Sequence, residues 1–313
     1  MKKTENTQKT SKSWIQHLII VLKGMWIGGT MTVPGVSGGS MAILLGIYDK
    51  LIFAISKFTK NIKANILFLV EFVLGAGVGL VLFSRFIMML LERFEMPTSY
   101  FFLGAVAGGI PLIIKEAKIT KNDFISKKTG KFGAYTAGKV LLYLVYAGIG
   151  ILIVYLMSLL PEGLFSSHEG GIGNFLIKIV GGAIVALALV LPGISVSQML
   201  LMLGLYEEVF GSIQNFDILP LIPLGIGLVA GIILSTLAIG KAIEKYAQAT
   251  YVIIFGFVLG SLPELFPGWP SGGEIAACIA TAILGFAVII LIMKGSDKAE
   301  AVSAKAQSQP SEE

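Results

Sequence analysis

Two long apolar stretches, each interrupted near its middle by Pro-Gly, constrain the fold of this chain more than any other feature. They cover residues 14–56 and 172–213, with the interruptions at Pro34-Gly35 and Pro192-Gly193. Proline removes a helix hydrogen bond and glycine frees the backbone, so each interruption ends one helix and allows another to begin. Each stretch is therefore predicted to form two helical arms rather than one straight helix.

Six other stretches are apolar over about 20 residues, the length that a helix needs to cross a bilayer. They are residues 66–90, 98–114, 134–160, 218–240, 250–266 and 273–293. Only 14% of the residues are charged, against about 25% in soluble domains, and 55% are hydrophobic, so the surplus apolar surface has to face lipid. The sequence therefore predicts an all-α integral membrane protein.

The charged residues between these stretches indicate the topology. We assume that each interrupted stretch is a hairpin that enters and leaves on one side, and that the N-terminus is cytoplasmic. The inner face then holds the lysines at positions 2, 3, 9, 12, 57, 60, 63, 115, 118, 121, 127, 128, 131, 241, 245, 294 and 298. The outer segments are 92–97, 161–171, 207–217 and 262–274, and the charged residues within them are mainly acidic. This positive-inside pattern favours two re-entrant hairpins, six spanning helices and cytoplasmic termini in a bacterial cytoplasmic membrane.

The two halves of the chain repeat one another. Val33-Pro34-Gly35-Val36-Ser37 matches Leu191-Pro192-Gly193-Ile194-Ser195, at a spacing of 192 − 34 = 158 residues. Leu45-Gly46-Ile47-Tyr48-Asp49 matches Leu203-Gly204-Leu205-Tyr206-Glu207 at the same spacing. Later pairs keep a similar offset: Gly75 with Gly225, Gly104 with Gly256 and Gly108 with Gly260. Because each half holds one hairpin and three crossings, an odd number, we predict inverted-topology repeats.

These patterns divide the chain into four parts. We expect a polar cytoplasmic N-terminus at 1–13, a first membrane repeat at 14–160 and a second, inverted repeat at 161–294. Residues 295–313 are polar with few apolar groups, which predicts a disordered cytoplasmic tail.

Short polar sequences follow both interruptions and form the main candidate site. Helix N-termini present unpaired N–H groups and the positive end of a dipole, an arrangement that suits an anion. Serine and glycine there also permit tight helix packing, but two copies at matching breaks favour a ligand site near the bilayer midplane. The predicted binding residues are Ser37, Gly38, Gly39, Ser40, Ser195, Ser197 and Gln198.

Two charged residues lie inside the span 66–90. Glu71 and Arg85 are 85 − 71 = 14 residues apart, which places them on one helix face about 21 Å from each other. Intramembrane charges usually face a cavity or the bundle interior, although snorkelling is the alternative. We expect Arg85 to offset the charge of a bound anion and Glu71 to couple transport to protons. Lys23 and Lys178, in the first hairpin arms, either contact the anion or snorkel.

Several kinds of chemistry find little support in the sequence. With the single cysteine Cys278 and two histidines far apart, we expect neither a disulfide nor a metal site, and no cofactor. The arginines are Arg85 and Arg93, too few for an arginine clamp on a phosphoryl group. We therefore expect a protein that is not an enzyme. The net charge of +5 reflects membrane topology, so nucleic acid is not an expected partner.

The stretch Gly28-Gly29-Thr30-Met31-Thr32-Val33-Pro34-Gly35-Val36-Ser37-Gly38-Gly39-Ser40, followed by Leu45-Gly46-Ile47-Tyr48, resembles the bacterial polyprenyl-phosphate transporter family, formerly domain-of-unknown-function family 368. The resemblance covers roughly residues 14–294 and includes the second Pro-Gly-Ile-Ser element. It implies a flippase that returns undecaprenyl phosphate, the lipid carrier of cell-wall synthesis, from the outer to the inner leaflet. It carries over no residue-level mechanism.

Two other functions remain open at this stage. One is a transporter or channel for a small water-soluble anion, and the other is a membrane phosphatase or transferase acting on lipid carriers. A flippase needs a groove that opens sideways to lipid, whereas a small-anion carrier needs a closed aqueous vestibule. The sequence gives no indication of the oligomeric state.

Overall fold

The computed structural model describes residues 2–31, 36–119, 134–159, 161, 163–165, 171–215 and 217–307. Every regular element within these residues is helical, as the sequence predicts for an all-α membrane protein. The first interruption, Pro34-Gly35, and most of the basic segment 115–131 lie outside the described residues.

The first half begins with α1 (Lys2–Thr30), followed by the short helices α2 (Gly38–Leu44) and α3 (Tyr48–Ser56). It continues through a 3-10 turn (Phe58–Lys60) to α4 (Ile62–Arg93), α5 (Glu95–Glu116) and α7 (Ala134–Ser158). The second half holds α8 (Ile172–Val190), α9 (Val196–Leu203) and α10 (Tyr206–Gln214). It ends with a 3-10 turn (Leu219–Leu221), α11 (Ile222–Leu265) and α12 (Glu274–Gln307).

Six of the described helices are long and apolar enough to cross a membrane, namely α4, α5, α7, α8, α11 and α12. The chain is therefore a multi-pass membrane protein. The expected spans 218–240 and 250–266 correspond to the two helical arms of α11, which meet at a kink at the non-helical residue Tyr246. Helix α12 continues to Gln307, so residues 295–307 are helical where the sequence predicts a disordered tail.

The repeated Leu-Gly-x-Tyr motif marks a sharp bend in the second arm of each hairpin. Gly46 and Gly204 have φ angles of 63° and 72°, in the left-handed region that glycine adopts without strain. In each copy the N–H of the glycine and the N–H of the next residue donate to main-chain carbonyl oxygens of the preceding helix, as in a Schellman cap. Helices α2 and α3 consequently meet at an angle of 114°.

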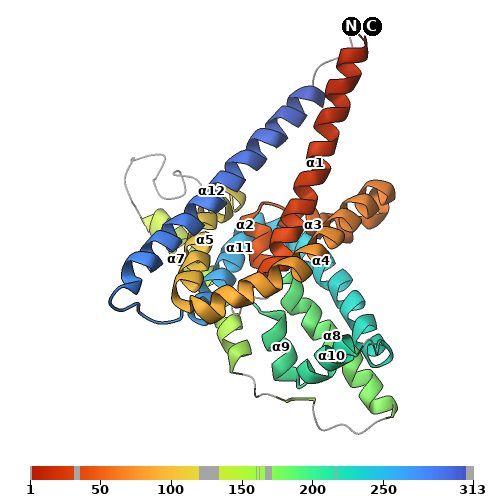
Figure 1. Cartoon of the computed structure of the whole chain (residues 1–313), viewed down its shortest axis with the longest axis vertical. Helices are drawn as coiled ribbons and strands as arrows, with labels where there is room; N and C mark the ends of the chain where they lie inside the picture. Colours follow the sequence, from red (N-terminus) through yellow and green to blue (C-terminus); the bar gives the residue numbers. More distant parts are fainter. Residues whose placement is uncertain are drawn as a thin grey trace.

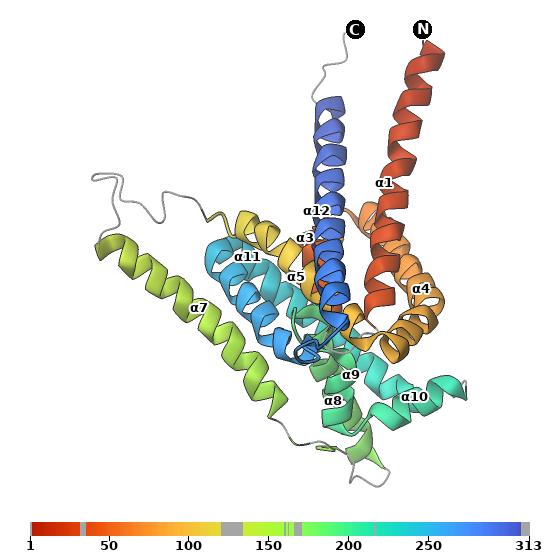
Figure 2. The ribbon, with the colours of Figure 1, turned by 60° about the vertical axis from the view of Figure 1, so that its left-hand side comes forward.

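The two hairpins enter the molecule from opposite ends. Helix α1 descends from the end where α12 finishes, whereas α8 rises from the other end, and both stop near the middle (Figures 1 and 2). Helix α8 has 19 residues, which at 1.5 Å per residue gives about 28 Å, close to the thickness of a hydrocarbon core. The first arm of the second hairpin is therefore as long as a spanning helix.

Glycines at matching positions bring the first arm of each hairpin into backbone contact with the next long helix. A Cβ atom on Gly75 of α4 would lie 2.3 Å from the carbonyl oxygen of Val21 on α1. A Cβ on Gly227 of α11 would lie 1.9 Å from the carbonyl oxygen of Ile179 on α8. The contact equivalent to Gly75 is therefore made by Gly227, at 227 − 75 = 152, and not by Gly225, whose Cβ would meet nothing within 4 Å.

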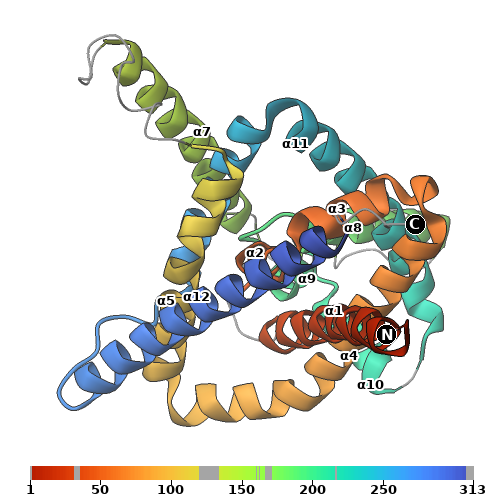
Figure 3. The same cartoon turned by 90° about the horizontal axis from the view of Figure 1, so that it is seen from above.

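The last helix of each half packs on the other half. A Cβ on Gly104 of α5 would lie 1.9 Å from the carbonyl oxygen of Ala282 on α12. A Cβ on the matching Gly256 of α11 would lie 2.1 Å from the carbonyl oxygen of Ala147 on α7. In the view from above, α12 passes over α5 (Figure 3). Helices α7 and α12 therefore exchange partners between the halves.

Replacing Gly75 by alanine tests the glycine contact between α1 and α4. The added methyl group meets the Val21 carbonyl, so we expect the free energy of unfolding to fall by about 1–3 kcal/mol. Gly77→Ala, two residues along the same helix, is the matched control, because its Cβ would meet nothing within 4 Å. Thermal unfolding in detergent should show a lower midpoint for Gly75→Ala only, and equal midpoints would contradict this packing.

Candidate functional site

The tips of the two hairpins meet through a small network of hydrogen bonds. The backbone N–H of Gly193 donates to Oγ of Ser37 at 2.8 Å and to Oγ of Ser40 at 2.9 Å. Ser37 caps α2 by accepting from the N–H of Ser40 at 3.0 Å, and its hydroxyl donates to Oγ of Ser40 at 3.0 Å. Two of the predicted binding residues thus bond directly to the opposite interruption.

Glycine is required on both sides of this contact. Gly193 has a φ of 82°, and a Cβ there would lie 2.2 Å from the carbonyl oxygen of Phe257. A Cβ on Gly39 would lie 3.0 Å from the nitrogen of Pro192. Gly38 and Gly39 are both buried. The backbone of the first tip therefore packs directly against the backbone of the second.

The second tip carries the other predicted binding residues. Ser195 is buried at the N-cap of α9 and makes no side-chain capping bond, and Ser197 is half-buried. The Gln198 amide, oriented with its nitrogen toward Glu264 of α11, donates to both carboxylate oxygens at 2.9 Å. Glu264 was expected in an outer loop. In the structure it lies in the last turn of α11, where its carboxylate occupies the hydrogen-bond donors of Gln198.

Little space remains at the tips in this conformation. A pocket of about 10 Å³ lies against Gly193, Ser195, Gln198 and Glu264. A single water needs roughly 10–15 Å³, so a phosphate group does not fit. The structure therefore brings the two tips together in a closed arrangement.

The structure describes the side chain of only one of the two charged residues predicted to function in α4, Glu71 and Arg85. The side chain of Arg85 lies outside the described part of the structure. Glu71 is mostly buried, and its Oε1 lies 2.7 Å from Nδ1 of His17 on α1. Sequence reasoning missed His17 because the pairing of α1 with α4 depends on their glycine contacts, which fix which side chains face each other.

The first hairpin is anchored to the second half by two tyrosines. The buried Tyr48 hydroxyl donates to the carbonyl of Val190 at 3.1 Å, where α8 ends. The hydroxyl of Tyr251 on α11 donates to the carboxylate of Asp49. Lys178, one of the two lysines in the first hairpin arms, forms an ion pair with Glu208. Among the described residues, no three His, Cys, Asp or Glu side chains group as metal ligands.

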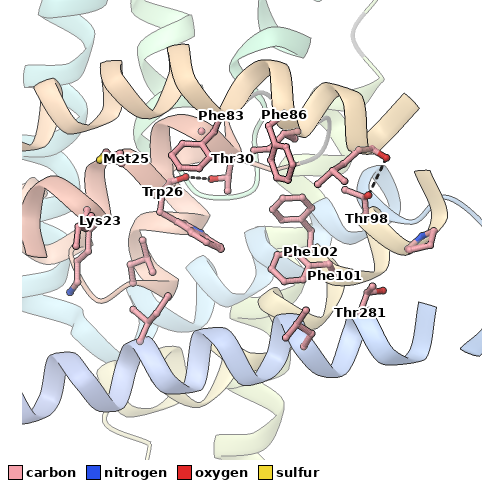
Figure 4. A pocket seen from close by; sticks show the side chains of 18 of the residues that line it. Lys23, Met25, Trp26, Thr30, Phe83, Phe86, Thr98, Phe101, Phe102 and Thr281 are labelled. Carbon is pink, nitrogen blue, oxygen red and sulfur yellow. Dashed lines mark hydrogen bonds between the residues drawn. The ribbon is translucent and has the colours of Figure 1, made fainter. Parts of the chain in front are cut away.

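A spacious cavity lies beside the tips rather than between them. It measures about 930 Å³ and is enclosed by the α1–α4 pair on one side and the α5–α12 pair on the other. Apolar and aromatic side chains make up most of its wall, and Lys23 stands at one end (Figure 4). Sequence reasoning did not predict it, because it forms between helix pairs.

Comparisons with known proteins identify one family model and two relatives by sequence. A family model described as undecaprenyl phosphate translocase-like matches residues 27–283. A polyprenyl-phosphate transporter from Staphylococcus aureus is 33% identical over 287 residues, which cover 88% of this chain and 95% of that protein. A polyprenyl-phosphate transporter from Vibrio cholerae is 27% identical over 267 residues, which cover 81% of this chain and 79% of that protein. No solved structure matches the chain.

The family model spans most of the chain, including both hairpin tips and the helices α4, α5, α7, α8 and α11. The chain belongs to the undecaprenyl phosphate translocase-like family.

Proposed function

We propose that this protein is a flippase for undecaprenyl phosphate that works in the bacterial cytoplasmic membrane, with both termini in the cytoplasm. It returns the lipid from the outer to the inner leaflet by alternating access between two inverted repeats. Family membership and the two relatives named polyprenyl-phosphate transporter support the substrate class. The lysine distribution supports the orientation.

The contact of the two hairpin tips is the observation that carries the proposal. An isolated charge in hydrocarbon costs tens of kcal/mol by Born estimates, so a lipid phosphate crosses only where polar groups replace water. The N–H of Gly193 and the hydroxyls of Ser37 and Ser40 are such groups, drawn from hairpins that enter from opposite ends. We take the present arrangement as occluded, and separation of the tips would free these groups for phosphate.

Two charged residues complete the proposal. Arg85 would offset the phosphate charge while the head group passes. Glu71 would couple transport to protons, and its carboxylate lies 2.7 Å from Nδ1 of His17. The small-anion alternative has weaker support, since the spacious cavity has an apolar lining rather than that of an aqueous vestibule.

Removing the hydroxyl groups at the tips tests the site. In proteoliposomes with leaflet-resolved undecaprenyl phosphate, we expect Ser37→Ala, Ser40→Ala, Ser195→Ala and Arg85→Ala each to slow transport by about tenfold, a barrier change of about 1.4 kcal/mol. Ser261→Ala is the matched control, because Ser261 is equally buried but donates within its own helix to Val258.

Two results would count against the proposal. Wild-type vesicles that move lipid no faster than empty vesicles would exclude the flippase. Wild-type transport with normal rates in all four variants would exclude the site while keeping the function. Release of inorganic phosphate by the purified protein would favour the phosphatase alternative instead.

Glu71→Gln tests proton coupling. The amide cannot take up or release a proton, so we expect the variant to lose the response of transport to an imposed pH gradient while still binding lipid. His17→Gln should weaken the same response. Transport would be measured in vesicles with and without the gradient, and an unchanged response in both variants would remove this pair from the mechanism.

A further inference from the structure

The cavity lies between two pairs of helices, and in each pair the two helices pack closely on each other. Glycine contacts join α1 to α4 and α5 to α12, and the cavity of about 930 Å³ lies where these two pairs face each other. That volume is near the upper end of the range of about 300–1,000 Å³ for ligand pockets. The cavity is therefore large enough for a sizeable ligand.

Its walls are suited to hydrocarbon. Phe83 and Phe86 of α4 face Phe101 and Phe102 of α5 across the space (Figure 4). The threonines of the wall direct their hydroxyls back to main-chain carbonyls, as Thr281 does to Cys278 at 3.1 Å. These hydroxyls therefore add little polarity to the cavity surface.

The cavity opens on the outer surface of the protein. Leu22, Phe86 and Phe94 all line it, and they are 51%, 51% and 57% exposed. Large apolar side chains exposed on this surface face lipid in a membrane protein. A chain in the bilayer can therefore enter from the side.

The polar groups of the wall lie together on one face of α1. Lys23 and Trp26 both line the cavity and are three residues apart, which places them on the same side of the helix. The Nε1 of Trp26 is buried and has no hydrogen-bond partner within the described part of the chain. A cation beside an unused N–H donor is complementary to an anionic head group.

We infer that this cavity binds the isoprenoid chain of the transported lipid, with the phosphate held at Lys23 and Trp26. The inference rests on the proposed function and adds a second, lateral site to it. Thr30, which ends α1, and Leu45, which ends α2, also line the cavity, so it borders the first hairpin tip. The head group reaches the tips along α1 while the chain stays among the aromatic side chains.

Filling the cavity tests the chain site. We expect Thr281→Trp to weaken binding of undecaprenyl phosphate by about tenfold and to change binding of the ten-carbon geranyl phosphate much less. Ile283→Trp is the matched control, because Ile283 is 63% exposed on the same helix and does not line the cavity. Binding would be measured by native mass spectrometry of the purified protein in detergent.

Neutralising Lys23 tests the head-group site. Lys23→Gln should weaken binding of undecaprenyl phosphate about tenfold and leave binding of undecaprenol unchanged. Trp26→Phe, which keeps an aromatic ring and removes the N–H, should act in the same direction. Lys178→Gln is the control, since Lys178 occupies the first arm of the other hairpin and pairs with Glu208.

The contrary results are specific. Equal affinities of Thr281→Trp and Ile283→Trp for undecaprenyl phosphate would overturn the inference. It would also be overturned if dioleoyl phosphatidic acid bound the wild-type protein as tightly as undecaprenyl phosphate and lost the same affinity in Thr281→Trp. Crosslinking wild-type protein to a polyprenyl phosphate with a diazirine on its chain avoids any folding defect. Crosslinks on α4, α5 and α12 support the cavity even if no lipid is transported, whereas transport with crosslinks elsewhere overturns the inference and keeps the flippase.

Discussion

Backbone groups released by a broken helix must find partners inside the membrane, and the rest of this structure follows from how that requirement is met. At the second interruption the N–H of Gly193 is bonded by two serines from the first hairpin. Unsatisfied groups cost several kcal/mol in hydrocarbon, so the second interruption gains stability from these two serines. The contact of the two tips thus supplies polar partners to a backbone group that a helix no longer bonds.

Glycine contacts set the positions of the long helices around the tips. Without a hydrophobic force between helices in lipid, close backbone packing is a main source of association. Pairs such as Gly75 with Val21 and Gly227 with Ile179 place equivalent helices at equivalent distances in both halves. Departures from this symmetry are concentrated in side chains: Gln198 and Glu264 stand where the first half has Ser40 and Leu112, and Glu71 stands where the second has no carboxylate. The helix contacts therefore repeat between the halves more closely than the polar side chains do.

The sequence was a good guide to whatever depends on local pattern. Apolar length located α4, α5, α7 and α12, and the paired motifs located both hairpins and the bends at Gly46 and Gly204. Contacts that depend on which helices become neighbours were not predictable, and these include His17 with Glu71, Gln198 with Glu264 and the cavity beside Trp26. The two expected spans within α11 correspond to its two arms, and the kink between them lies at Tyr246, although no proline or glycine marks it. The predicted residues Ser37, Gly38, Gly39, Ser40, Ser195, Ser197 and Gln198 lie at the two tips, yet their closed packing could not be foreseen without the opposite backbone.

The exchange of α7 and α12 between the halves has a consequence for how the protein is made. Helix α5 leaves the ribosome long before α12, the helix that its Gly104 contacts. During synthesis the small-residue face of α5 therefore enters the bilayer before the helix that covers it. A chain truncated before residue 274 would lack α12 and would leave Gly104 without this packing partner.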